Sequence, residues 1–182
     1  MMPPLTPPAA SLSPVTYVVD TNVILVANGQ HPGVSAACIL ACQHWLSRLM
    51  AEGRVALDDA HAIVNEYQRK THVSDGHGVG DAFVRWVLQH HDDAARCDLI
   101  HLAPDAQRGF LSFPVDVELS HFDDSDRKFV AVAHAHPECP PILQAADSKW
   151  LDWAPHLREH GVQIRFLCCD DVQAFHSHKF GR

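Results

Sequence analysis

The feature that most constrains this chain is the apolar run Tyr17-Val18-Val19, which ends abruptly at Asp20-Thr21-Asn22. A continuous β-branched and aromatic run is typical of a strand that is buried on both faces of a parallel sheet. A carboxylate at the end of such a strand projects into the crevice at the carboxyl edge of the sheet, where open α/β proteins bind ligands. The run therefore predicts an α/β fold with Asp20 in a candidate site.

The rest of the chain alternates between short apolar runs and longer segments with helical periodicity, which predicts a mainly parallel sheet of about five strands with right-handed crossovers. The predicted strands cover about residues 16–20, 54–57, 97–103, 141–145 and 162–167. The predicted helices cover about residues 34–52, 59–70, 81–91, 124–137 and 148–160, with a last short helix after Asp170-Asp171. Asp58 or Asp59 is the expected N-cap of the second helix.

Two long connections interrupt this alternation. Gly76, Gly78 and Gly80 indicate a flexible loop, and residues 104–122 form an irregular segment that is long enough to suggest a functional loop. Its apolar residues 110–113 are expected to cover the core, with the active-site edge or a partner as the alternative contacts. The four tryptophans fall at helical spacing and are expected in the core.

Length and composition are those of a single globular domain. The chain has 182 residues, and we expect one domain over residues 15–182 after a disordered tail, 1–14, which is rich in Pro, Ser and Ala and carries no Lys or Arg. No apolar stretch reaches the roughly 18 residues of a membrane span. The expected location is the cytoplasm, with no membrane contact.

Net charge and cysteine content argue against two classes of site, a broad basic surface for nucleic acid and a cysteine-based metal or redox centre. A net charge of −8 argues against broad adhesion to nucleic acid through a basic face, but it is compatible with a metal site that binds phosphate. The six cysteines include no Cys-x-x-Cys pair, so we interpret them as buried small hydrophobic residues in a reducing compartment. The histidines near 134–136 and 176–178 do not match zinc spacing and are interpreted as surface residues.

Four acidic residues occupy positions that this architecture would bring together: Asp20, Glu66, Asp126 and Asp147. Clustered carboxylates raise one another's pKa unless a cation lies between them. Oxygen ligands select Mg²⁺ or Mn²⁺, which would bind a phosphodiester oxygen and activate a water for attack on phosphorus. Thr21 or Asn22 would orient a carboxylate or a water by hydrogen bonding.

Each of the four carboxylates also has a structural interpretation. Asp20 suits a turn, Glu66 could pair with Arg69 or Lys70 on its own helix, and Asp147 could cap the following helix. In Asp123-Asp124-Ser125-Asp126, the same residue types serve as cap and as ligand, and we favour Asp126 as the ligand. Arg127, Lys128 and Lys149 are equally suited to contact phosphates or to remain solvated.

The segments Val18-Val19-Asp20-Thr21-Asn22-Val23, the Glu66 helix, 126–133 and 142–147 together resemble the four acidic motifs of the PIN domain, over about residues 16–170. The resemblance implies a three-layer α/β/α fold and Mg²⁺- or Mn²⁺-dependent cleavage, usually of RNA, as in the toxins of VapBC toxin–antitoxin pairs. It implies Asp20, Glu66, Asp126 and Asp147 as metal ligands, with Asn22 in support. It also implies a possible antitoxin partner and a possible homodimer.

The chain departs from the family pattern at three places. It is longer near 74–80 and 104–122, and Ala145 stands where the fourth motif usually has Thr or Ser. A nuclease that acts without an antitoxin fits the sequence about as well as a toxin does.

We therefore expect a metal-dependent endoribonuclease, with single-stranded DNA as a possible further substrate. The alternative is a catalytically silent PIN-like module that binds RNA or a protein partner. A phosphotransferase with an Asp nucleophile is the weakest hypothesis, because Asn22 stands where such enzymes generally have a second Asp.

Overall fold

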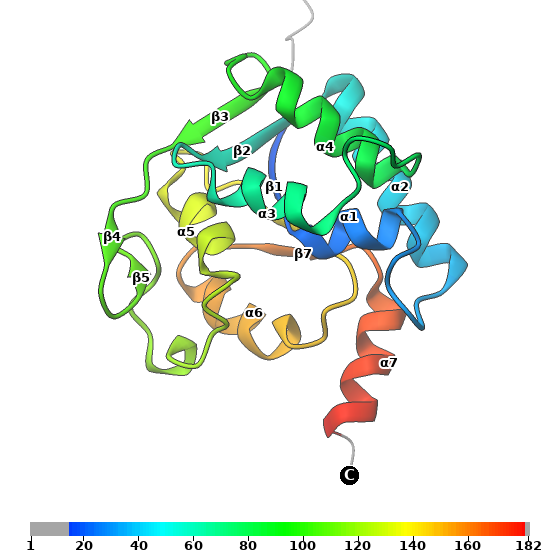
Figure 1. Cartoon of the computed structure of the whole chain (residues 1–182). Helices are drawn as coiled ribbons and strands as arrows, with labels where there is room; N and C mark the ends of the chain where they lie inside the picture. Colours follow the sequence, from blue (N-terminus) through cyan, green and yellow to red (C-terminus); the bar gives the residue numbers. More distant parts are fainter. Residues whose placement is uncertain (1–14, 181–182) are drawn as a thin grey trace, which may run out of the picture.

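A five-stranded parallel sheet forms the centre of the protein (Figure 1), whose structure, a computed structural model, describes residues 15–180. The predicted tail, 1–14, and residues 181–182 lie outside the described residues. The strand order is β3-β2-β1-β6-β7. The strands are β1 (Thr16–Val19), β2 (Arg54–Asp58), β3 (Cys97–Ile100), β6 (Ile142–Gln144) and β7 (Ile164–Phe166).

Helices cover both faces of this sheet, so the predicted α/β class and three-layer α/β/α arrangement are confirmed. On one side α1 (Thr21–Ala27), α2 (Ala36–Glu52), α3 (Ala62–Lys70) and α4 (Val79–His90) pack against one another. On the other side α5 (Arg127–Ala135) packs on β1, β2 and β6, with α6 (Trp150–Glu159) on the same side (Figure 1). The last helix, α7 (Cys169–Phe180), projects from the body of the domain (Figure 1).

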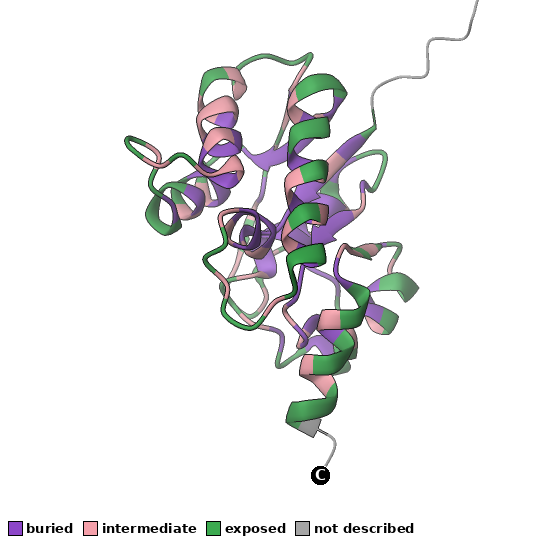
Figure 2. Ribbon diagram, turned by 90° about the vertical axis from the view of Figure 1, so that its right-hand side faces the viewer, coloured by how far each residue is buried: buried purple, intermediate pink, exposed green. Residues whose placement is uncertain are grey.

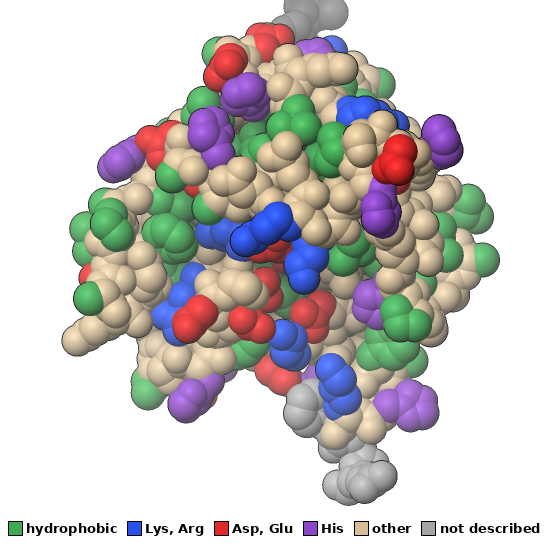
Figure 3. Space-filling model, viewed as in Figure 1, with side chains coloured by type: hydrophobic (Ala, Val, Ile, Leu, Met, Phe, Trp, Pro, Cys, Tyr) green, Lys and Arg blue, Asp and Glu red, His purple; other side chains and the backbone are tan. Residues whose placement is uncertain are grey.

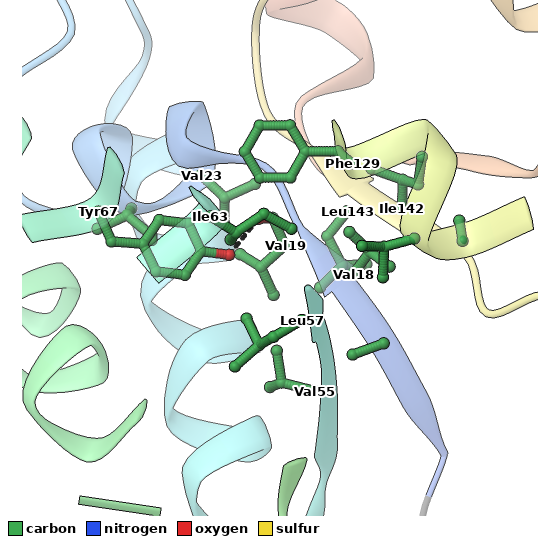
Figure 4. Packing of buried hydrophobic residues seen from close by; sticks show 14 of the residues in the cluster. Val18, Val19, Val23, Val55, Leu57, Ile63, Tyr67, Phe129, Ile142 and Leu143 are labelled. Carbon is green, nitrogen blue, oxygen red and sulfur yellow. Dashed lines mark hydrogen bonds between the residues drawn. The ribbon is translucent and has the colours of Figure 1, made fainter. Parts of the chain in front are cut away.

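The core lies between these layers, with buried strands and helix faces inside and exposed helix faces outside (Figure 2). Val18 and Val19 of β1 are fully buried, as the continuous apolar run predicts for a central parallel strand. The Tyr67 hydroxyl on α3 donates a hydrogen bond of 2.5 Å to the Val19 carbonyl oxygen (Figure 4). This bond fixes α3, which carries Glu66, against the end of β1.

The segment 104–122 contains a small hairpin, β4 (Pro104–Asp105) and β5 (Gly109–Phe110), and the 3₁₀ helix η1 (Val117–Leu119). Phe113 and Phe122 are both buried, and the Phe122 ring packs against Trp150 and Trp153. The prediction that apolar residues of this segment cover the core is therefore confirmed for Phe113, whereas Leu111 is exposed. Trp150 is fully buried, and the other tryptophans are half-buried against the core.

The glycines at 76–80 serve close packing, where the sequence predicted flexibility. A Cβ on Gly76 would lie 2.1 Å from Asp81 Oδ2, and a Cβ on Gly80 would lie 2.3 Å from the Ile24 carbonyl oxygen. Only glycine permits the backbone to approach these atoms so closely. The segment is thus fitted against α1 and the start of α4.

Two of the cysteines form a disulfide, Cys38–Cys168, which links α2 to the residue before α7. The interpretation of all six as reduced hydrophobic residues is wrong for this pair, because only their spatial proximity reveals the pairing. Cys42 and Cys97 are buried free thiols, as expected, whereas Cys139 and Cys169 are exposed. Within residues 15–180, no helix combines the length and the apolarity that a membrane span needs.

Candidate functional site

The middle of the sheet is a topological switch point. The chain leaves β1 towards β2 on one side, while β6 pairs with β1 on the other side. Asp20 follows β1 and Asp147 follows β6, so both residues lie at the carboxyl edge beside this switch point, where open α/β folds bind ligands.

A cavity of about 700 Å³ opens at this edge. Its lining residues are Asp20, Thr21, Asn22, Leu25, Glu66, Arg69, Lys70, Asp123, Ser125, Asp126, Asp147 and Lys149. Figure 3 shows acidic side chains gathered on this face with Lys and Arg side chains beside them. The structure thus brings all five of the predicted site residues to one cavity.

Asp20 is the most buried of these carboxylates, with 5% of its surface exposed. It is the N-cap of α1, and its Oδ1 accepts a hydrogen bond of 2.7 Å from the Asn22 backbone N–H. Burial and the neighbouring carboxylates of Asp126, Asp147 and Glu66 raise its pKa well above the ordinary value. Asp20 therefore caps a helix where the sequence suggested a turn, and the cap does not offset the surrounding negative charge.

Asp126 immediately precedes α5 and makes no side-chain capping bond to that helix. Its Oδ1 accepts a hydrogen bond of 3.1 Å from the Ser125 hydroxyl. Burial, and next the charge of Asp123, raises its pKa to about 6. Because Asp126 has no capping bond, its carboxylate is available to a ligand in the cavity.

Asp147 and Asp123 share Lys149. The Lys149 ammonium lies 2.9 Å from Asp123 Oδ2 and 3.7 Å from Asp147 Oδ2. The hydrogen bond to Asp123 raises the pKa of Lys149, and the same bond lowers the pKa of Asp123. Asp147 Oδ1 also accepts a hydrogen bond of 3.2 Å from the Lys149 backbone N–H. Asp147 is therefore partly neutralised and partly engaged in the turn before α6.

Glu66 lines the cavity, but both of its carboxylate oxygens already have partners. Its Oε1 accepts a hydrogen bond of 2.6 Å from the Thr21 hydroxyl, and its Oε2 lies 2.6 Å from the Lys128 ammonium. The expected alternative partners, Arg69 and Lys70, form no ion pair with it. The sequence analysis did not identify Lys128 as the partner, because 62 residues separate it from Glu66 and no local pattern links them.

Two of the three basic residues that flank the site have structural roles. Lys128 is buried in its pair with Glu66, and Arg127 is buried beside Asp124, at 2.9 Å, with its guanidinium over the Phe113 ring. Neither faces solvent in the way that a phosphate contact requires. Of the three, only Lys149 lines the cavity itself.

Asn22 positions the two strand ends relative to each other. Its side-chain Oδ1 accepts a hydrogen bond of 2.8 Å from the Ala146 backbone N–H, so the start of α1 is tied to the loop that carries Asp147. Its own backbone N–H donates to Asp20. Asn22 therefore holds the two strand ends that carry Asp20 and Asp147 in register.

The donor set suits a hard divalent cation. The available groups are carboxylate, hydroxyl and amide oxygens, which Mg²⁺ and Mn²⁺ prefer, and the raised pKa of Asp20 indicates unneutralised negative charge. In residues 15–180, the four predicted ligands contain no group of three whose ligand atoms lie within 4.8 Å of one another. An ion at this position would therefore bind at most two of these carboxylates directly and the others through water, as Mg²⁺ does at many sites.

A second cavity, of about 470 Å³, adjoins the first and shares Asn22, Asp147 and Lys149 with it. Its other wall includes His31 together with Phe175, His178 and Lys179 of α7. The carboxylate cavity therefore adjoins a second cavity that is lined in part by lysine and histidine side chains.

The comparisons with known proteins add nothing to this description. No protein-family model, no curated protein and no solved structure matches the chain.

Proposed function

We propose that the chain is a nuclease that uses Mg²⁺ or Mn²⁺ to hydrolyse phosphodiester bonds in RNA. The observation that carries this proposal is the environment of Asp20. Within residues 15–180 its carboxylate accepts one hydrogen bond, from Asn22, and burial together with three further carboxylates raises its pKa. Such a cluster costs free energy in the folded protein unless a cation binds to it.

The residues take the following roles in the proposed reaction. One or two of Asp20, Asp126 and Asp147 would bind the ion directly and the rest through water, and Asn22 would hold the two strand ends that carry Asp20 and Asp147. Glu66 would join them only where Lys128 gives up its ion pair. When bound, the ion would stabilise negative charge on the phosphodiester oxygen and would lower the pKa of a bound water. Hydrolysis then adds water across one phosphorus–oxygen bond and yields a phosphate monoester and a hydroxyl.

Cationic side chains on both sides of the carboxylates support a polyanionic substrate. Arg69 and Lys70 lie at the rim on α3, and Lys149 and Lys179 border the adjoining cavity. Phosphates on either side of the scissile bond would contact these groups, while the net charge of −8 limits adhesion elsewhere. RNA is preferred over DNA on the PIN resemblance alone, so single-stranded DNA belongs in every assay.

The test is cleavage of a mixed pool of labelled RNA and single-stranded DNA with Mg²⁺, with Mn²⁺ or with EDTA. The informative variant is Asp126→Asn, and its matched control is Asp124→Asn, which removes an exposed charge two positions away, outside the cavity. We expect cation-dependent cleavage that Asp126→Asn abolishes and Asp124→Asn retains. Equal cleavage by both variants would contradict the proposal and indicate a contaminating nuclease.

A second candidate function is a catalytically silent module that binds RNA or a protein partner. The observation in its favour is that Lys128 and Lys149 already neutralise Glu66, Asp123 and part of Asp147. This candidate predicts no cleavage with any cation, and RNA binding that survives the Asp126→Asn substitution. The toxin role, an antitoxin partner, a homodimer and the cytoplasmic location stay predictions from the sequence.

A further inference from the structure

A second group of metal-ligating side chains lies outside the proposed nuclease site, at the end of α6. Ligand atoms of Asp116, His156 and Glu159 all lie within 4.8 Å of one another. The His160 Nε2 lies 3.1 Å from Asp116 Oδ2, so this imidazole holds the carboxylate in place without joining the group of three. None of the four lines the cavity that contains Asp20.

The group follows from the local structure. His156 and His160 are four residues apart at the end of α6, so both side chains lie on one face of the helix, with Glu159 beside them. Asp116 approaches this face because it is the N-cap of η1, which packs against α6. Its Oδ1 accepts a hydrogen bond of 2.9 Å from the Glu118 N–H, which leaves Oδ2 facing His160.

The chemistry of this group differs from that of the carboxylate cavity. An imidazole with two carboxylates suits Zn²⁺, whereas Mg²⁺ prefers oxygen ligands alone. The Asp116 side chain is 14% exposed and that of His160 is 31% exposed, so the group is formed by the fold yet open to solvent.

The hydrogen bond between His160 and Asp116 explains the position of Asp116 alone. It gives no reason for the His156 imidazole and the Glu159 carboxylate to converge on the same point. A divalent ion bound by Asp116, His156 and Glu159 would account for the convergence, because it binds the imidazole and neutralises both carboxylates at once. We propose that Asp116, His156 and Glu159 form a zinc site, with His160 orienting Asp116, and that the bound ion clamps the 104–122 segment onto α6.

The experiment is equilibrium dialysis of the chelator-treated full-length protein against Zn²⁺, compared with the double variant His156→Ala/His160→Ala. The matched control is His90→Ala/His91→Ala, which removes two histidines from α4 that do not share a carboxylate. We expect the wild type and the control to retain about one more equivalent of Zn²⁺ than the test variant. Equal retention by all three proteins would overturn the proposal.

Co²⁺ in place of Zn²⁺ identifies the ligands without any substitution. Binding at the proposed site gives visible absorption bands with no sulfur-to-cobalt charge-transfer band. A charge-transfer band would instead assign the ion to a free thiol such as that of Cys42. A signal that disappears only in Asp20→Asn/Asp126→Asn would assign it to the carboxylate cavity. Either of these two results contradicts the proposed site, even where the histidine variant fails to fold.

Discussion

Two buried aspartates on the same side of this protein, Asp20 and Asp81, have opposite environments. They are similarly inaccessible, with exposed fractions of 5% and 4%. Asp20 accepts a hydrogen bond from Asn22 and faces other carboxylates, and burial together with these carboxylates raises its pKa. Burial alone therefore does not separate a structural carboxylate from a functional one.

Asp81 is surrounded by hydrogen-bond donors. Its Oδ1 accepts from the Asn28 side chain at 2.9 Å and from the His72 N–H at 3.1 Å, and its Oδ2 accepts from the Gly78 N–H at 3.2 Å. The Asn28 Oδ1 in turn accepts from the Asp81 N–H at 3.1 Å. This carboxylate connects α1, α4 and the glycine-containing loop.

Hydrogen-bond donors decide whether a buried carboxylate stabilises this fold. A buried carboxylate with several N–H donors stabilises the elements that supply them. A buried carboxylate that faces other carboxylates destabilises the fold unless a cation binds to it. Substitutions at these residues and their partners test this contrast.

The largest effect is expected from Asp20→Asn, which should reduce cation-dependent cleavage at least about a hundredfold. Removal of a residue that only hydrogen-bonds to a metal ligand costs about 10- to 100-fold in activity, and removal of the ligand itself should cost more. The amide oxygen can still accept from Asn22, and the charge repulsion is removed, so the metal-free protein should be as stable as the wild type or more stable. Cleavage rates and thermal unfolding with EDTA measure both effects. A large loss of stability would make Asp20 structural, like Asp81.

Asp81→Ala should have the opposite effects on stability and on cleavage. It leaves the buried donors of Asn28, His72 and Gly78 without their acceptor, which should lower the free energy of unfolding by about 3 kcal/mol. The cleavage rate per folded molecule should not change. Urea unfolding checks the first point, with the exposed Asp75→Ala as the control. If the cleavage rate falls by more than the fraction of folded protein, the regions around Asp81 and Asp20 are coupled.

Lys128→Met makes Glu66 resemble Asp20 by removing its counter-charge. We expect the metal-free protein to lose about 2 kcal/mol of stability, because a largely buried carboxylate then lacks its ion pair. Saturating Mn²⁺ should recover part of this loss, since a cation can occupy the place of the ammonium. Lys70→Met, at the cavity rim, is the control. No recovery with Mn²⁺ would exclude Glu66 as a ligand.

The smallest effect is a pH dependence of stability in the metal-free protein. The pKa of Asp126 is about 6 in the fold against 3.8 ordinarily, so between these values the folded state binds more protons than the unfolded state. The contribution of Asp126 to stability should therefore fall by about 1–2 kcal/mol as pH rises through this window, and should be constant above it. Urea unfolding of wild type and Asp126→Asn isolates this contribution. A wild type that gains stability relative to the variant would reverse the assignment.

Much of the fold and of the candidate site could be predicted because both depend on local order along the chain. The apolar run at Val18 and Val19 predicts a central strand, and a parallel sheet brings the residues after each strand to one edge. Asp20 and Asp147 follow from that rule, and Asp126 lies at the start of α5, the helix that leads into β6. The ends of the elements were predicted less accurately. The helix expected from about residue 59 begins at Ala62, because a turn follows Asp58, whose carboxylate accepts hydrogen bonds from the Ala62 and Ile63 N–H groups.

Pairings between distant segments could not be predicted. His136, interpreted as a surface residue, is 7% exposed and lies 3.3 Å from Asp98. The bonds of Glu66 to Lys128 and of Cys38 to Cys168 likewise join segments that share no sequence pattern. With fifteen histidines and six cysteines in the chain, composition alone leaves many partners open.

The sequence by itself determined the α/β class and the convergence of the acidic residues, because hydrophobic periodicity and strand ends are properties of neighbouring residues. Only the tertiary structure decided which carboxylates have donors, which have ammonium partners and which face one another. That decision depends on which distant helices pack side by side, and it separates Asp20 from Asp81.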